Sequence, residues 1–208
     1  MAIVIDSNHY HNHSTYTVDL DGTEITVTVT AVSSVVKKWL NDTLYLRRDY
    51  INQLVIGLGV QWTPGGYNPP ADTMQLCIGR RCLIFQLAHA EYIPQRLRSF
   101  LQNPNHTFVG FWNHSDRRKL ESSEHELKMF DDPIDLRYYA EDLCDEDLAG
   151  ASVDEIVEKC VGYEVEQRRE ISKSNWSDED LSDEQVSYAC VDAYCAFLMG
   201  KNIGAWEL

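Results

Sequence analysis

The chain has 208 residues, of which 44% are hydrophobic and 25% are charged, and its formal net charge is −15. This length fits one domain, which we expect to span residues 1–208, and the apolar fraction excludes a globally disordered chain. A protein that coats duplex DNA normally has a basic surface, because neutralised phosphates supply most of its affinity. The acidic charge therefore argues against extended, non-specific binding of nucleic acid, while a local groove could still hold a few nucleotides.

The cellular compartment is predicted from what the sequence lacks. The opening residues "MAIVIDSNHYHNH" have neither the cationic region nor the long apolar run of a signal peptide. No segment is apolar over the length needed to cross a bilayer. Six cysteines occur without a C-x-x-C motif, which favours buried, reduced thiols over disulfides or zinc sites. We expect no membrane partner and a cytoplasmic protein, with the nucleus as the alternative location.

The first half of the chain is predicted to be mainly β. Residues 15–29 ("TYTVDLDGTEITVTV") alternate around an Asp21-Gly22 turn, which indicates a hairpin. Residues 33–46 ("SSVVKKWLNDTLYL") predict an amphipathic helix capped by Ser33 or Ser34. Residues 53–62 ("QLVIGLGVQW") are nearly all apolar, as in a central strand buried on both faces. Two further strands, "TMQLCIG" and "CLIFQL", complete a meander with it.

Helices and one more buried strand are predicted for the second half. The predicted elements are a short helix over 94–104, a strand over 106–113, a helix over 114–127 with Asp116 in its first turn, and an acidic, mostly helical stretch over 131–159. The last helix has the clearest signal, because Ser182 and Gln185 form a capping-box pattern at its start. The order of elements predicts an α/β fold in which helices flank a mixed sheet.

Three segments resemble, in order and spacing, the motifs of Werner-type DEDDy 3′–5′ exonucleases. "KSNWSDEDLSDEQVSYACVDAYCAF" is similar to their third motif, which contains Y-A-A-x-D-A-Y. "TFVGFWNHSDRRKL" is similar to the second, in which a strand ending in V-G precedes an aspartate and a K-L pair. "VIGLGVQWTP" resembles the first, usually G-L-D-x-E-W. The resemblance covers about residues 55–203 and implies an RNase H-like, DnaQ-type exonuclease fold.

The resemblance also implies a reaction and residues for it. Enzymes of this family hydrolyse phosphodiesters with two divalent ions, Mg²⁺ or Mn²⁺, which activate water and stabilise the leaving oxygen. By position, Asp116 and Asp192 would be metal ligands and Tyr188 would orient the attacking water. Trp62 matches a motif position and is expected to stack on a terminal base, since stacking tolerates any sequence. Lys119 is expected to contribute to substrate binding.

The first motif departs from the family pattern. Gly59 stands where an aspartate normally bridges both metals, and Gln61 stands where a glutamate normally ligates one. Glycine offers no side-chain ligand, while the glutamine carbonyl is a neutral and weaker one. Two hypotheses stay open: a slow or specialised 3′–5′ exonuclease, and a catalytically inactive module that binds RNA ends or a protein partner. We favour the first, in which Asp72, Asp135, a neighbouring subunit or substrate phosphate could help to hold a metal.

Within the family, this chain is most similar to stand-alone plant Werner-like proteins, including the RISC-interacting clearing exoribonucleases. That resemblance implies short single-stranded RNA as substrate, an Argonaute (RISC) complex as partner, and a homo-oligomeric ring with a hexamer as one possible size. It implies Mg²⁺ or Mn²⁺ bound weakly, with binding only alongside substrate as one option. The residues themselves do not distinguish RNA from DNA.

Overall fold

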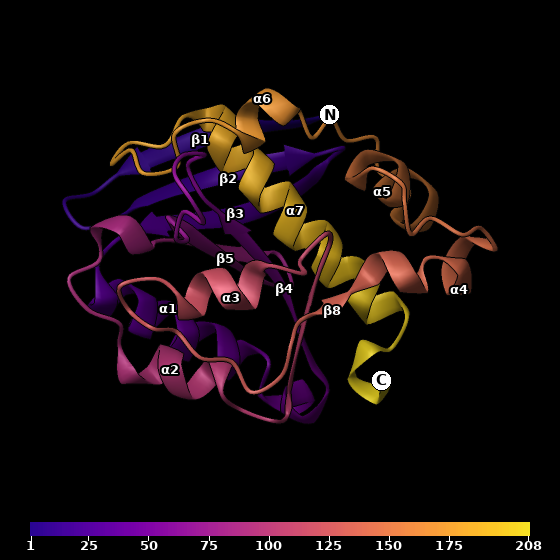
Figure 1. Cartoon of the computed structure of the whole chain (residues 1–208), viewed down its shortest axis with the longest axis horizontal. Coiled ribbons are helices and arrows are strands. Elements are labelled where there is room, and N and C mark those ends of the chain that lie inside the picture. Colours follow the sequence, from indigo (N-terminus) through magenta and orange to yellow (C-terminus); the bar gives the residue numbers. More distant parts are fainter.

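A mixed sheet forms the centre of the computed structural model, which describes the backbone of residues 1–208 and every side chain except those of residues 50–52. In this described backbone the sheet has eight strands in the order β1-β2-β3-β6-β5-β4-β7-β8 (Figure 1). The strands are β1 Ala2–His9, β2 Ser14–Leu20, β3 Thr23–Thr30, β4 Leu54–Gln61, β5 Thr73–Ile78, β6 Arg81–Gln86, β7 His106–Gly110 and β8 Ile134–Asp135. Parallel pairs join β3 to β6, β4 to β7 and β7 to β8, and the other neighbours are antiparallel. The predicted α/β fold with a mixed sheet is therefore confirmed.

Helices cover both faces of this sheet. The α-helices are α1 Ser33–Leu46, α2 Gln95–Leu101, α3 Asp116–Glu121, α4 Glu141–Cys144, α5 Val153–Val161, α6 Arg169–Ser172 and α7 Asp183–Asn202. Short 3₁₀ helices are η1 Arg48–Gln53, η2 Leu87–His89, η3 Leu136–Tyr139 and η4 Ala205–Glu207. Helices α1, α2 and α3 share one hydrophobic core with the sheet, whereas α7 crosses the opposite face (Figure 1). In the part of the chain whose side chains are described, no helix combines the length and apolarity needed to span a membrane.

Strand β4 contacts the helices on both faces of the sheet, because successive side chains of a strand point to opposite faces. Its even-numbered positions from Leu54 to Val60 pack into the core under α1 and α2. Its odd-numbered positions face α7, as Gly57 shows: a methyl group there would overlap the backbone oxygen of Ala193. The glycine therefore allows α7 to lie directly on the sheet, and the same alternation places Gly59 and Gln61 beneath that helix.

Several local predictions are confirmed and one is wrong. The β2–β3 hairpin turns at Asp21 and Gly22, whose φ angles of 47° and 82° fit a tight hairpin turn. The capping box at the start of α7 forms as predicted. The predicted serine cap of α1 is wrong, because the N-cap residue is Val32 and makes no side-chain cap. Ser33 is buried within the first turn and donates its hydroxyl hydrogen to the Tyr92 carbonyl instead.

The region after β7 differs most from the prediction. The strand was expected to run to Asn113, but it ends at Gly110, and Trp112 adopts a left-handed φ of 51°. The helix that follows is shorter than expected and begins at Asp116. The acidic stretch over 131–159 is only partly helical, since it begins with β8 and a 3₁₀ turn. The unexpected turn at Trp112 therefore separates the end of β7 from the start of α3.

Candidate active site

The three sequence motifs meet at one cavity of about 400 Å³ on the α7 side of the sheet. Its lining residues are Leu58, Gly59, Val60, Gln61, Trp62, Pro64, Phe111, Trp112, Asp116, Val153, Ser172, Lys173, Tyr188 and Asp192. Gln61 comes from the end of β4, Asp116 from the start of α3, and Tyr188 and Asp192 from successive turns of α7. Residues that are far apart in sequence are therefore brought together as the motif order requires.

Asp116 is a nearly buried carboxyl at the first position of α3, with 6% of its surface exposed. Burial raises its pKa well above the ordinary value, and the negative charges of Asp192 and Asp135 raise it further, while Lys119 lowers it. A carboxyl in this environment holds its proton to higher pH than a free aspartate does. A cation bound in the cavity would oppose this effect, because it favours the ionised form.

The Asp192 carboxylate accepts hydrogen bonds from two glutamine amides. Gln167 Nε2 donates to Asp192 Oδ1 at 2.9 Å, and Gln61 Nε2 donates to Asp192 Oδ2 at 3.4 Å. Burial raises the pKa of Asp192 to about 6, and the hydrogen bond from Gln167 partly offsets this rise. The side chain is thus oriented by neutral donors on both oxygens, and at neutral pH it is mostly ionised.

Tyr188 lies one helical turn before Asp192, and its phenol lines the same cavity. Burial raises its pKa, and the nearby charge of Asp192 raises it further. The phenol therefore stays protonated at neutral pH and can exchange hydrogen bonds with water, but it does not act as a base. The geometry agrees with the predicted orienting role, which stays a prediction.

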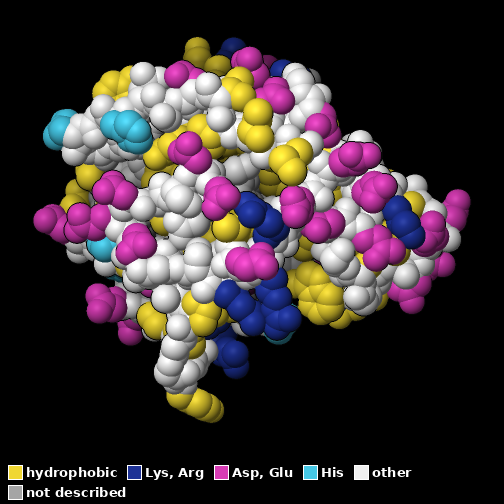
Figure 2. Space-filling view, turned by 90° about the horizontal axis from the view of Figure 1, so that it is seen from above, with side chains coloured by type: hydrophobic (Ala, Val, Ile, Leu, Met, Phe, Trp, Pro, Cys, Tyr) yellow, Lys and Arg dark blue, Asp and Glu magenta, His cyan; other side chains and the backbone are white. Residues whose placement is uncertain are grey.

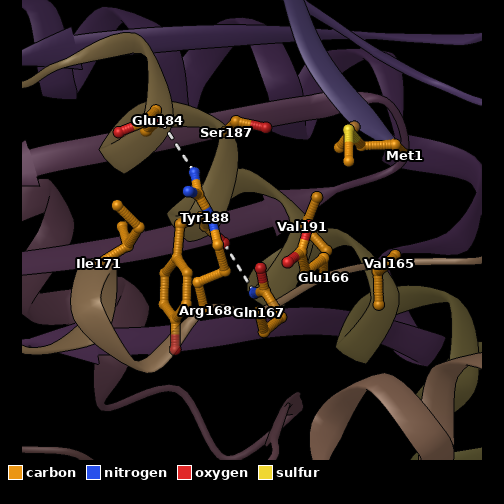
Figure 3. A pocket seen from close by; sticks show the side chains of 11 residues that line it. Met1, Val165, Glu166, Gln167, Arg168, Ile171, Glu184, Ser187, Tyr188 and Val191 are labelled. Carbon is orange, nitrogen blue, oxygen red and sulfur yellow. Dashed lines mark hydrogen bonds and ion pairs between the residues drawn. The ribbon is translucent and has the colours of Figure 1, made fainter.

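Gln167 is a residue that sequence reasoning missed. Its amide also donates to the Tyr188 carbonyl at 3.0 Å, so it connects the helix backbone to the Asp192 carboxylate. Figure 3 shows the hydrogen bond between Gln167 and Tyr188. The view is into a second cavity, of about 230 Å³, which Gln167 also lines and in which Arg168 pairs with Glu184. Gln167 lies in an irregular segment before α6, and no sequence pattern there marks it. Only the folded chain shows its contact with the site.

The position of the missing first-motif aspartate is partly filled by a neighbouring strand. Gln75 pairs with Gly59 across β5 and β4, and its Oε1 lies 2.8 Å from the point where a Cβ on Gly59 would lie. Gln75 is fully buried, and among the described residues its Oε1 has no hydrogen-bond partner. A neutral amide therefore replaces a negative charge here. The meander predicted from the sequence implies this pairing, but the register needed to find Gln75 does not follow from the sequence.

The two predicted substrate-binding residues contact each other. Trp62 lines the cavity, and Lys119 Nζ lies 4.1 Å from the centroid of its ring. The same ammonium donates to the Pro69 carbonyl at 2.6 Å and is nearly buried. Lys119 therefore supports Trp62 from behind and does not line the cavity. Tyr67, a second aromatic residue near Trp62 in sequence, is fully exposed in the loop after β4.

The two acids considered as replacements are already engaged elsewhere. Asp135 forms an ion pair with Arg137 at 2.7 Å, and Asp72 Oδ2 accepts the backbone N–H of Thr63 at 2.6 Å. Neither residue lines the cavity. The structure gives no support to the idea that either acid completes the site from within the chain.

A family model described as 3'-5' exonuclease matches residues 63–204. The protein belongs to this family. The match begins two residues after Gln61, so it excludes the strand in which both acids are replaced. The predicted membership of the RNase H-like 3′–5′ exonucleases is thus confirmed, while the plant subfamily stays a prediction.

Curated relatives share this assignment over part of their length. The bifunctional 3'-5' exonuclease/ATP-dependent helicase WRN of Mus musculus is 27% identical over 157 residues, which cover 72% of this chain and 11% of the relative. Exonuclease 3'-5' domain-containing protein 2 of Drosophila melanogaster is 30% identical over 154 residues, which cover 72% of this chain and 25% of the relative. The chain therefore spans a quarter or less of the length of these relatives.

Solved structures confirm the fold. The Aedes aegypti Nibbler EXO domain matches with a TM-score of 0.64 at 16% identity, over 86% of this chain and 87% of that domain. Escherichia coli RNase D, an exoribonuclease involved in structured RNA processing, matches with a TM-score of 0.60 at 18% identity, over 80% of this chain and 43% of RNase D. At these identities the likeness concerns the RNase H-like fold alone.

Exonuclease domains of this kind use divalent metals, which need a set of oxygen donors. Among the residues with described side chains, no three His, Cys, Asp or Glu residues form a metal-binding group. The cavity nevertheless contains two carboxyls whose charges repel each other, and the Gln61 amide could present its oxygen by rotation. Hard cations such as Mg²⁺ and Mn²⁺ prefer these oxygen donors. The set fits one divalent ion and does not fit a pair.

Proposed function

We propose that this protein is a slow 3′–5′ exoribonuclease that shortens single-stranded RNA from its 3′ end by metal-assisted phosphodiester hydrolysis. The observation that carries the proposal is the convergence of Asp116, Tyr188 and Asp192 on one cavity in a member of the 3′–5′ exonuclease family. A site without function has no need to hold two mutually repelling carboxyls near one another, since their burial costs free energy.

Each residue has a defined task in this proposal. Asp116, Asp192 and the Gln61 oxygen would hold one Mg²⁺ or Mn²⁺, which supplies Lewis-acid polarisation of the scissile phosphate. The protonated Tyr188 phenol orients a water molecule by hydrogen bonding. Gln167 keeps the Asp192 carboxylate in place. The rate is slow because the site lacks the two first-motif carboxylates and their charge.

Charge and shape favour a short single strand. Acidic side chains are spread over the face shown in Figure 2, while lysine and arginine side chains gather in small groups. With a net charge of −15, the protein is poorly suited to bind a long duplex. Binding a few nucleotides end-on through aromatic stacking needs little basic surface. We further propose a cytoplasmic protein that assembles as a homo-oligomeric ring and acts beside an Argonaute complex, as the plant resemblance implies.

The test uses one RNA labelled in turn at its 5′ and its 3′ end. Purified protein in excess is incubated with each RNA, and with DNA of the same sequence, in Mg²⁺, in Mn²⁺ and in EDTA. We expect a metal-dependent ladder from the 3′ end of RNA, reduced by at least about 100-fold in Asp192→Ala. Asp180→Ala, which removes an exposed aspartate in the loop before α7, is the matched control and should keep the activity. A ladder that persists in Asp192→Ala would indicate a contaminating nuclease.

One observation favours a second candidate function, a catalytically inactive module that binds RNA ends. Both Asp192 oxygens already accept amide hydrogens, and a neutral amide lies where the first-motif aspartate would be. Such a site could hold a strand end without any metal. If RNA binds in EDTA but is not shortened at protein excess in either metal, this second function is correct and the nuclease proposal fails.

A further inference from the structure

Trp112 is an exposed aromatic residue held in an unfavourable backbone conformation beside the cavity. It follows β7, and 43% of its surface is exposed. Its φ of 51° lies in the left-handed region, which bulky side chains rarely adopt because of steric strain. Strain of this kind persists only where surrounding contacts impose it, and it is concentrated at functional sites.

Contacts from two other segments hold the Trp112 ring. Its indole N–H donates to the Ala151 carbonyl at 3.2 Å, and the Arg137 guanidinium carbon lies 3.5 Å from the ring centroid. Arg137 is itself fixed, because only 6% of its surface is exposed and it donates to both Asp135 oxygens and to the Ala149 carbonyl. A buried arginine that is held by Asp135 and Ala149 thus supports a partly exposed ring.

Ordinary core packing does not explain this arrangement. A tryptophan that only stabilised the fold would gain most by burying its ring, since apolar burial is the main source of stability. Here the ring is oriented by a hydrogen bond and a cation, yet much of it stays accessible and lines the cavity. Such an arrangement presents a rigid aromatic surface and loses little side-chain entropy when a planar group stacks on it.

The cavity has a second tryptophan with similar support. Trp62 also lines it, with the Lys119 ammonium over its ring. Both tryptophans are therefore paired with a cation in a protein whose net charge is −15. The charge of Arg137 is already paired with Asp135, so Lys119 is the cation that partly offsets the repulsion that phosphates would meet here. Aromatic surfaces with nearby cations are the elements with which proteins bind single-stranded nucleic acid.

We propose that Trp112 stacks on a nucleobase of the bound single strand, and so forms a base-binding position in addition to the one expected at Trp62. This inference rests on the proposed function, because it takes a single-stranded nucleic acid as the ligand. Stacking on the ring would be sequence-tolerant, since every base has an aromatic face.

Binding of a 5′-fluorescein-labelled octamer RNA, measured by fluorescence anisotropy in EDTA, tests the inference without catalysis. We expect Trp112→Leu to weaken binding about tenfold, and Trp112→Phe to keep most of the affinity because it retains an aromatic face. Tyr138→Leu is the matched control. Tyr138 is also exposed and also lies near Arg137, but it does not line the cavity, so its substitution should leave binding unchanged.

An abasic scan shows whether the loss comes from stacking. The octamer is prepared with one abasic ribose at each position in turn, and each is measured with the unsubstituted protein and with Trp112→Leu. At the position that stacks on Trp112, the two proteins should bind the abasic RNA equally. An equal loss at every position, or tenfold weaker binding in Trp112→Phe as well, would overturn the inference.

The same data separate this inference from the proposed function. RNA that is shortened from its 3′ end while Trp112→Leu binds normally refutes the stacking role alone. Trp112-dependent binding without any shortening refutes the nuclease and supports the stacking role. If the unsubstituted protein does not bind the octamer at up to 100-fold excess, the stacking role is wrong regardless of activity.

Discussion

Strand β4 and helix α7 form the two walls of the same site, but they differ in what they retain. Helix α7 carries the tyrosine and the aspartate of the third motif, with Tyr188 and Asp192 in the cavity and an intact capping box at its start. Strand β4 keeps its buried position and its glycine contact with α7 but carries Gly59 and Gln61 in place of acids. The two elements therefore pack closely against each other, although β4 lacks the acidic side chains that would bind metal.

This difference shows that scaffold and chemistry depend on different residues. Packing of β4 against α7 depends on Gly57, whose lack of a side chain lets the helix backbone approach. We expect metal affinity to depend on positions 59 and 61, where Gly59 and Gln61 face the same helix but contribute no charge. Because the two roles fall on different residues of the same strand face, changes at one set of positions need not disturb the other.

We expect the largest effect on stability from a substitution that disturbs the packing of β4 against α7. Gly57→Ala would place a methyl group onto the Ala193 carbonyl and close to the Phe197 nitrogen, both of which are helix backbone atoms that cannot move aside separately. We expect a loss of about 3 kcal/mol or more in the free energy of unfolding, or failure to fold. Thermal unfolding followed by circular dichroism measures the loss.

Gly150→Ala is the control for that substitution, because a methyl group at Gly150 meets nothing within 4 Å. Its melting temperature should stay within about 2 °C of the parent protein. If Gly57→Ala were equally stable, the close approach of α7 to β4 would be wrong, and with it the placement of the third motif over the first.

The next effect tests whether the missing ligands alone limit the chemistry. In Gly59→Asp/Gln61→Glu, the new Cβ at position 59 would lie 2.8 Å from Gln75 Oε1. The Gln75 amide, whose Nε2 donates to Thr73, can rotate to donate an amide hydrogen to the new carboxylate. We expect Mn²⁺ affinity to rise and the rate of 3′-end shortening to increase by about 100-fold or more. Calorimetric titration with Mn²⁺ and the labelled-RNA assay provide independent readouts.

The matched control, Gly150→Asp/Gln102→Glu, adds the same charge at positions outside the cavity. It should change neither Mn²⁺ affinity nor rate. An increase in Mn²⁺ affinity without faster shortening would show that the rest of the site is not competent. In that event the RNA-end-binding alternative would be favoured over the nuclease.

Local signals in the sequence predicted most of the fold but only part of the site. The Asp21-Gly22 hairpin and the Ser182 capping box are specified by neighbouring residues, so both were predictable. Gln75 and Gln167 were not, because each reaches the site through strand register or an irregular segment far away in sequence. The turn at Trp112 was also missed, since no local residue preference marks its left-handed φ, and the ring's contacts, Arg137 and Ala151, lie far away in sequence.

The smallest effect concerns the pH dependence of the third-motif acid in the absence of metal. The pKa of Asp192 is about 6 in the folded protein, against 3.8 for an ordinary aspartate. The folded state therefore binds more protons than the unfolded state between about pH 4 and pH 6, and its stability falls as pH rises through that window. Asp192→Asn removes this cost, which we place at about 2 kcal/mol above pH 6 for a partly exposed group.

Thermal unfolding in EDTA from pH 4 to pH 8 measures this cost as a difference between two proteins. The melting temperature of Asp192→Asn should exceed that of the parent by about 4–8 °C at pH 7, with the gap closing toward pH 4. The removal of Asp192 also lowers the pKa of Asp116, which adds to the gap in the same direction. The exposed Asp180→Asn should show no such trend. A difference in melting temperature that is constant with pH would mean that burial does not raise the Asp192 pKa. The Asp192 carboxylate would then be exposed to solvent.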